Sequence, residues 1–127
     1  MIEELPPAAM QSSAEAYPYQ ARFLVRKNGC VLIVRSTQID WIEACARYCT
    51  LHAGNDVYRV PGPFGQVVAR LSLAHFIQAS RSSLVNIERI AHLYTPATHI
   101  LMVQMRNGES VRISRRFRRS VMAQLDS

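Results

Sequence analysis

The densest group of chemically capable side chains lies near the C-terminus, where four arginines follow Ser114: Arg115, Arg116, Arg118 and Arg119. A guanidinium can grip a phosphate, or the O6 and N7 atoms of guanine, with two parallel hydrogen bonds. We expect Ser114 to cap a helix here. Four cations at the positive end of a helix dipole repel one another, and no acidic residue stands at helical spacing to relieve them. A solvated helix face is the plain interpretation, but this unfavourable charge favours contact with an anion such as phosphate.

Another arginine, Arg81, stands in the middle of the run from Phe76 to Asn86. Apolar residues alternate with hydroxyl residues in this run, which predicts a strand that enters a turn. Because the neighbours Ser80 and Ser82 are small, we expect Arg81 to project without shielding. Ser82 and Asn86 are expected to satisfy backbone groups of the turn.

The charge of the chain is distributed unevenly. The sequence has 15 Lys and Arg residues and a formal net charge of +6, and every basic residue lies after residue 20. Lys27 is the only lysine. A basic domain rich in arginine has nucleic acid as its leading partner class. An anionic membrane surface is the alternative, and it would require a basic amphipathic helix with a large apolar face.

Catalytic and cofactor-binding motifs are missing from the sequence, which has no GxSxG, glycine-rich phosphate loop or HExxH pattern. The four histidines have no ligand spacing: His52, His75, His92 and His99. Asp40 and Glu43 stand three apart on a predicted strand, so they should face opposite sides and cannot act as a carboxylate pair. We therefore expect no enzyme activity, no metal or cofactor and no small-molecule substrate.

The three cysteines, Cys30, Cys45 and Cys49, match no paired zinc spacing. An odd number of free cysteines is typical of a reduced, cytoplasmic protein. No apolar run is long enough to span a bilayer or to act as a secretory signal, which also predicts the cytoplasm and no membrane partner. A redox pair of Cys45 and Cys49 is left open by their spacing.

Turn signals divide the chain into short β-prone segments. Residues 1–20 are rich in proline and alanine, which is typical of a disordered arm or linker, so we expect one folded domain over residues 21–127. Two strands, over residues 22–27 and 30–35, should flank Asn28-Gly29, a pair that suits a type I′ turn. Further strands are expected over residues 39–44, 48–52, 57–60, 100–105 and 110–113.

Two helices should accompany these strands. Apolar residues at helical spacing predict a short helix over residues 64–71. Near the C-terminus, Phe117, Val121 and Leu125 recur every four residues and should face the core. The expected fold is therefore mainly β, with antiparallel sheet, one short central helix and a C-terminal helical segment.

Three separated segments resemble the LytTR DNA-binding domain, a family found in LytR/AlgR-type bacterial response regulators. The first consists of residues 39–44 with Tyr48 and Leu51-His52, and is similar to the family pattern I-x-x-I-E-A…Y-x-x-L-H. The second follows the pattern F-x-x-x-x-[RKN]-S-x-x-V-N-x-x-x-I through Phe76, Arg81-Ser82, Val85-Asn86 and Ile90. The third is the S-R-R-[YF]-[RK] pattern within residues 111–118. The resemblance covers about residues 21–125, in the correct order.

The resemblance implies an elongated, sandwich-like core of antiparallel sheets, whose loops on one side enter successive major grooves of double-stranded DNA. Carried over by position, it implies three side chains that contact bases: Arg47, Arg81 and Arg115. It implies phosphate contacts by three more: Arg116, Arg118 and Arg119. It also assigns two residues to structural support of the recognition turn, namely Ser82 and Asn86.

Two positions depart from the family pattern. Arg47 stands where Asn is common and Ser80 where His is common, which moves the expected base preference near residue 47 toward guanine. Relatives commonly carry a receiver domain before this one, and residues 1–20 are too few to hold it. The protein is therefore either a free-standing regulator or a fragment of a longer one. We predict a bacterial transcriptional regulator without a receiver domain in this chain, which binds paired half-sites in promoter DNA sequence-specifically, as a homodimer.

Two other functions fit the same sequence. A LytTR-fold interaction module that modulates another regulator, without binding DNA itself, would expose apolar surface and form a stable complex. A single-strand or RNA binder would need exposed aromatic rings as stacking platforms, whereas we expect Trp41, Phe64 and Phe117 to be buried.

Overall fold

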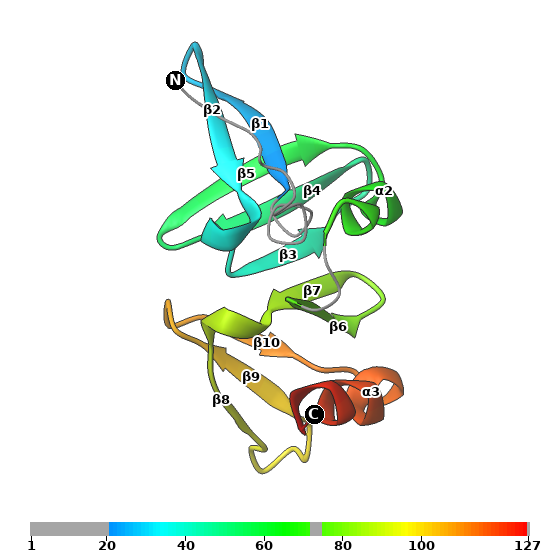
Figure 1. Cartoon of the computed structure of the whole chain (residues 1–127). Coiled ribbons are helices and arrows are strands. Elements are labelled where there is room, and N and C mark those ends of the chain that lie inside the picture. Colours follow the sequence, from blue (N-terminus) through cyan, green and yellow to red (C-terminus); the bar gives the residue numbers. More distant parts are fainter. Residues whose placement is uncertain (1–20, 72–74, 127) are drawn as a thin grey trace, which may run out of the picture.

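The computed structural model describes residues 21–71 and 75–126, and Figure 1 shows their arrangement. The predicted arm over residues 1–20 lies outside the described residues. In the described residues, three antiparallel sheets and two α-helices make a mainly β fold, as the sequence predicted. Neither α-helix in this part of the chain is long and apolar enough to cross a membrane.

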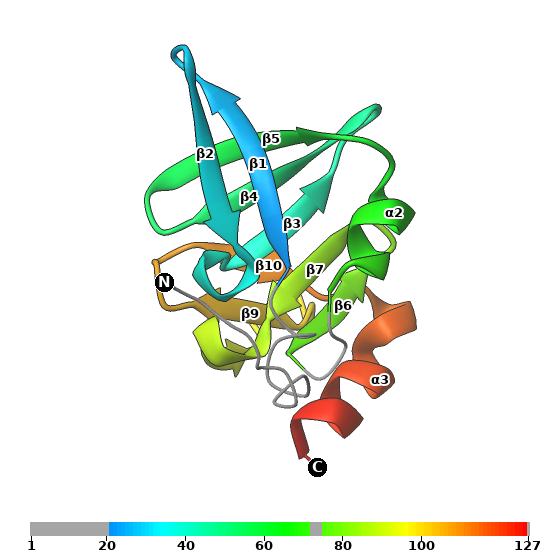
Figure 2. The same ribbon diagram turned by 45° about the horizontal axis from the view of Figure 1, so that its top comes forward.

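The first sheet is the predicted hairpin of β1 (Arg22–Lys27) and β2 (Cys30–Arg35). Asn28 and Gly29 have φ angles of 53° and 79°, and these positive values confirm the turn type expected from the pair. One face of the hairpin carries Phe23 and Val25 into a core shared with the five-stranded sheet. In Figure 2 the hairpin lies across β4 and β5, and β1 contacts β5.

The five-stranded sheet has the strand order β5-β4-β3-β7-β6. Its strands are β3 (Trp41–Ala44), β4 (Tyr48–Ala53), β5 (Asp56–Pro61), β6 (Phe76–Ser80) and β7 (Ser83–Asn86). Strand β3 pairs antiparallel with β4 on one side and with β7 on the other. The end of β3 therefore lies beside the start of both neighbours. As a result, the β3–β4 turn and the β6–β7 turn open at the same edge of the sheet.

The third sheet has the order β10-β9-β8. It consists of β8 (Ile90–Tyr94), β9 (Met102–Met105) and β10 (Ser110–Arg112), and the sequence analysis did not predict β8. Short 3-10 helices, η2 (Ser36–Gln38) and η3 (Ile87–Arg89), lead into β3 and β8. After β10, the predicted C-terminal helix α3 (Arg115–Asp126) packs against β6 with Val121 fully buried.

Two hydrophobic clusters form the core, and the β6–β7 hairpin contributes side chains to both. Phe76 and Leu84 belong to the first cluster, which the β1–β2 hairpin and the helix α2 (Phe64–Ala69) help to cover. Ile77 and Val85 belong to the second, which lies toward the third sheet and α3. Successive side chains of a strand point to opposite faces. The β6–β7 hairpin therefore lies between the two hydrophobic clusters, with one face packed on each, and the fold is sandwich-like (Figure 1).

Two sequence-based expectations about packing need correction. Helix α2 ends at Ala69, so Leu71 is buried beyond the helix and not on it. The three aromatic residues expected to be buried are only partly so, because each packs at the margin of a cluster: Trp41, Phe64 and Phe117.

Candidate nucleic-acid interface

Three arginine-bearing segments meet at one edge of the molecule, and we call them the arginine edge: residues 45–47, 81–82 and 114–116. The backbone N–H of Ala44 donates to the carbonyl of Ser82 over 2.7 Å, which fixes the first segment beside the second. The N–H of Ser114 donates to the carbonyl of Ala79 over 2.9 Å, which fixes the start of α3 beside the same turn. The positions predicted to contact bases thus come from adjacent segments.

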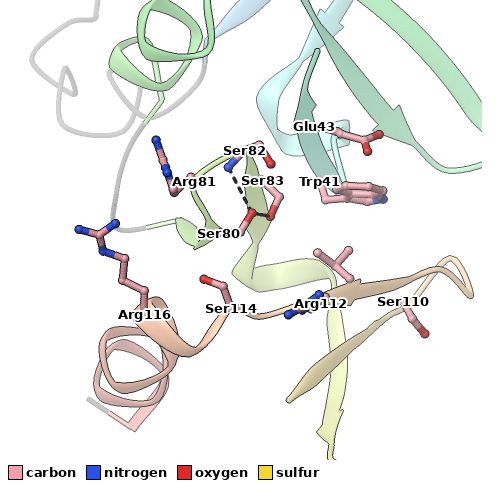
Figure 3. Close-up of a pocket in the computed structure, with 11 residues that line it drawn as sticks. Trp41, Glu43, Ser80, Arg81, Ser82, Ser83, Ser110, Arg112, Ser114 and Arg116 are labelled. Atoms are coloured by element: carbon pink, nitrogen blue, oxygen red, sulfur yellow. Dashed lines mark hydrogen bonds between the residues drawn. The ribbon is translucent and has the colours of Figure 1, made fainter. Parts of the chain in front are cut away.

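Arg81 lies in the β6–β7 turn, between two serines, Ser80 and Ser83, whose hydroxyls are hydrogen-bonded to each other. The hydroxyls of Ser80 and Ser83 lie 2.7 Å apart, and the N–H of Ser82 donates to the Ser80 hydroxyl over 3.2 Å (Figure 3). The strand register shifts just before the turn, between Gln78 and Ser80. Arg81 itself is exposed. The serines therefore stabilise a tight turn that exposes the side chain of Arg81.

Asn86 lies at the other end of β7 and is 3% exposed. Its side-chain amide donates to the carbonyl of Ile39 over 2.9 Å, and its side-chain oxygen accepts from the N–H of Glu88 over 3.0 Å. The first bond joins the end of β7 to the segment that precedes β3, and the second caps the start of η3. Asn86 therefore does not contact the turn at Arg81 directly, and it can support that turn only by fixing how β7 pairs with β3.

Arg47 is exposed in the β3–β4 turn. Its carbonyl accepts a hydrogen bond of 3.1 Å from the N–H of Gly62, which ties the turn to the end of β5. The next residue, Tyr48, has the guanidinium of Arg59 above its ring, 4.8 Å from the centroid. The backbone of this turn is thus held while the side chain of Arg47 extends outward.

The start of α3 departs from its prediction at Ser114. A capping serine would accept a hydrogen bond from an early helix N–H. Instead, the Ser114 hydroxyl oxygen is buried and has no hydrogen-bond partner in the described residues, while the Ser114 carbonyl accepts from the N–H of Phe117 over 3.0 Å. The predicted side-chain cap is therefore wrong, because the serine side chain points into the cleft between α3 and the β6–β7 turn (Figure 3).

The arginines at the start of α3 divide between two clefts. Arg116 lines the first, of about 540 Å³, together with Arg81 and Arg112 (Figure 3). Arg115 lines the second, of about 390 Å³, together with Arg118 and again Arg112. Residues three apart share a helix face, whereas neighbours do not. The resemblance implied one role for Arg115 and Arg81 and another for Arg116 and Arg118, whereas in the structure Arg116 lines a cleft with Arg81 and Arg115 lines one with Arg118.

Positive charge at the arginine edge has no carboxylate partner in the described residues. Ion pairs of the described side chains join His52 to Glu43 and Glu109, and no arginine takes part in them. All six arginines predicted to contact DNA are exposed: Arg47, Arg81, Arg115, Arg116, Arg118 and Arg119. Glu43 is the only acidic residue among the described residues that line the first cleft. The exposed guanidinium groups are therefore available to an anionic ligand.

A cluster of polar contacts that the sequence did not predict connects the first cleft to the third sheet through Trp41, His52 and Glu109. The ring of Trp41 stacks on His52 with centroids 4.0 Å apart, and its indole N–H donates to Glu109 Oε1 over 3.1 Å. His52 Nε2 lies 3.5 Å from Glu43 Oε1, and His52 Nδ1 lies 3.4 Å from Glu109 Oε2. No spacing signal joins these residues, because Trp41 and Glu109 are 68 positions apart.

The three cysteines are free thiols in the structure. Cys49 is fully buried in the first cluster, and burial raises the pKa of its thiol, with a further rise from the nearby Cys45. The Cys45 sulfur lies 3.5 Å from the hydroxyl of Thr50, whose side chain leaves β4 on the face opposite to Cys49. Cys30 is exposed in the hairpin. In the described residues, no group of His, Cys, Asp and Glu is arranged to hold a metal ion.

Comparisons with known proteins agree with this geometry. The sequence matches the family model of the LytTr DNA-binding domain over residues 29–126. The fold is similar to that of the LytTr DNA-binding domain of a protein described as a methyl-accepting/DNA response regulator from Bacillus cereus, with a TM-score of 0.75. The two share 19% sequence identity, and the likeness covers 84% of this chain and 98% of that one. No curated protein sequence matches the chain. At this identity, the structural likeness shows a common fold only.

Proposed function

The chain belongs to the LytTR DNA-binding domain family, and we propose that it is a bacterial transcriptional regulator that binds promoter DNA sequence-specifically. The observation that carries this proposal is the convergence of residues 45–47, 81–82 and 114–116 at one edge, where no described carboxylate neutralises their arginines. A duplex offers phosphates along its backbone and base edges in its grooves, and guanidinium groups bind both.

The arginines divide into two roles. Arg47 and Arg81 are the proposed base contacts, because each stands at the tip of a turn. The third base contact was assigned to Arg115 by resemblance, but Arg116 is favoured by the geometry because it lines the same cleft as Arg81. Arg118 and Arg119 stand farther along α3, on its exposed surface, and are proposed to hold phosphates with Arg115.

Two copies on neighbouring half-sites are the proposed active form. A single small module buries about 600–1,000 Å² of protein surface on DNA, which limits the affinity of one copy. A pair of half-sites would place two arginine edges on the same duplex. Binding as a homodimer on DNA is therefore the expectation, with action in the cytoplasm and no small-molecule substrate.

The alternative is an interaction module of the same fold that modulates another regulator without binding DNA. One observation favours it: the outer face of the β1–β2 hairpin exposes Leu24, Val31 and Ile33, with exposed fractions of 65%, 53% and 56%. Leu24 pairs with Ile33 and Val31 pairs with Arg26 across the two strands, so the three apolar side chains share one face with an arginine. A regulator complex that forms in the absence of DNA and is lost on Ile33→Ser would support this function.

The test of DNA binding is a titration of labelled promoter-length duplex across a series of salt concentrations. Each phosphate contact should contribute about −0.9 to the slope of log K against log salt. A steep negative slope, with unlabelled single strands competing poorly, is the expected result. A slope near zero, or equal competition by single strands, would contradict duplex binding.

A further inference from the structure

We infer that the arginine edge recognises guanine, so that the preferred half-site carries guanines at the positions its three segments contact. This inference rests on the proposed function and specifies the DNA that the interface selects. It follows because the long polar side chains of the three segments are arginines, and because the segments contain no side chain of the kinds that recognise adenine or cytosine.

The side chains at the arginine edge supply hydrogen-bond donors of one kind. Residues 45–47 read Cys-Ala-Arg, residues 81–82 read Arg-Ser and are flanked by Ser80 and Ser83, and residues 114–116 read Ser-Arg-Arg and follow Arg112-Ile113. None of these positions holds Asn, Gln, Asp, Glu, His or Lys. Long polar side chains at the edge are therefore all guanidinium groups, which donate and never accept.

The four bases make different demands in the major groove. Guanine presents two acceptors, N7 and O6, which match the two parallel donors of one guanidinium. Adenine presents a donor beside an acceptor, a pattern that Asn or Gln satisfies, and cytosine presents a donor that needs Glu or Asp. Thymine offers a single acceptor and a methyl group. An edge whose long side chains only donate therefore discriminates in favour of guanine.

The other polar side chains near these arginines have contacts of their own. The hydroxyls of Ser80 and Ser83 bond to each other, 2.7 Å apart, and the Cys45 sulfur lies 3.5 Å from the Thr50 hydroxyl. Glu43 is the only carboxylate among the described residues that line the first cleft, where it could accept from cytosine, but it lies 3.5 Å from His52 Nε2. Since Arg81 and Arg116 line this cleft together, the guanines they contact should lie close together in the half-site.

The experiment is selection of bound duplexes from a random pool by the full chain. The expected result is enrichment of guanine, on either strand, at two or more positions of each half-site. Replacing one selected guanine by 7-deazaguanine, which lacks the N7 acceptor, should weaken binding by about 5- to 150-fold. The variant Arg81→Gln should move one position from guanine toward adenine. The matched variant Arg118→Gln, at a proposed phosphate contact outside the first cleft, should weaken binding to all duplexes alike and leave the selected sequence unchanged.

The outcomes separate this inference from the function on which it rests. If duplexes are selected but their positions are rich in A·T, or if 7-deazaguanine binds as well as guanine, the guanine inference is overturned and DNA binding stands. If Arg118→Gln changes the preference as much as Arg81→Gln, the assignment of guanine reading to the turns is also overturned. If no duplex is retained above non-specific binding, both the inference and the proposed function fail.

Discussion

The indole N–H of Trp41 donates a 3.1 Å hydrogen bond to the carboxylate of Glu109, and so ties β3 to the turn between β9 and β10. The same carboxylate accepts from the side-chain amide of Asn107 over 2.7 Å. Because β10 leads directly into α3, this bond joins the five-stranded sheet that carries Arg81 to the β9–β10 hairpin that precedes Arg116.

Trp41→Phe removes the indole donor and keeps an aromatic ring against His52. We expect the free energy of unfolding to fall by about 1 kcal/mol, since a net hydrogen bond contributes about that much. Urea denaturation measures the loss. The control is Tyr94→Phe, which removes an exposed 3.0 Å bond to Ser110 and should cost less than about 0.5 kcal/mol. Equal losses of unfolding free energy in the two variants would show that the bond to Glu109 stabilises the fold no more than an exposed hydrogen bond does.

Asn86→Ala should destabilise the fold far more than Ser82→Ala. The first change leaves the Ile39 carbonyl without its buried partner and removes the bond to Glu88, at a cost of about 2–3 kcal/mol. The Ser82 hydroxyl is exposed and its backbone makes the structural bonds, so its loss should cost within about 0.5 kcal/mol. Thermal unfolding of both variants compares them directly. A large loss on Ser82→Ala would mean that the hydroxyl itself shapes the turn.

Arg115→Ala and Arg116→Ala distinguish the two assignments of the third base contact. If Arg116 reads a base with Arg81, its removal should cost about 1–3 kcal/mol on the preferred site and flatten discrimination between sites. Arg115→Ala should instead weaken all duplexes alike and lower the salt slope by about 1. Binding to the preferred site and to a scrambled site, at two salt concentrations, gives both quantities. The reverse result would restore the assignment made by resemblance.

Cys49 should be the least reactive thiol in the folded protein. Its pKa is raised from the ordinary 9.0, chiefly by burial, so the folded state holds this proton more tightly than the unfolded state. The corresponding stability is fully present below pH 9 and is lost as the pH rises above 9 through the higher pKa of the folded state, because the unfolded thiol ionises first. Alkylation followed by mass spectrometry should therefore modify the exposed Cys30 well before Cys49. Modification of Cys49 at the same rate as Cys30, without denaturant, would contradict its burial.

Local signals predicted a large part of this structure. The Asn28-Gly29 pair specified its hairpin, and the repeat of Phe117, Val121 and Leu125 specified α3. Strand β8 was missed because the sequence Ile-Ala-His-Leu-Tyr lacks regular alternation and follows no strong turn pair. Its place is set by pairing with β9, which is a tertiary constraint.

The candidate site was predictable in composition but not in arrangement. Arg81 and the arginines near the C-terminus were identified from their spacing and charge. Which face of α3 points toward Arg81 depends on how that helix packs on β6, and the sequence of the helix alone does not determine this. The Trp41–Glu109 bond was equally out of reach, since only the folded sheets bring the two residues together.

The most direct measurement is an NMR titration of the isotope-labelled protein with the selected duplex, in which each backbone amide reports its own environment. Amides of residues 45–47, 81–82 and 114–116 should shift together at the same duplex concentration, while those of the β1–β2 hairpin stay in place. Shifts confined to the hairpin, or shifts in one of the three segments without the others, would show that DNA does not meet the protein along the arginine edge.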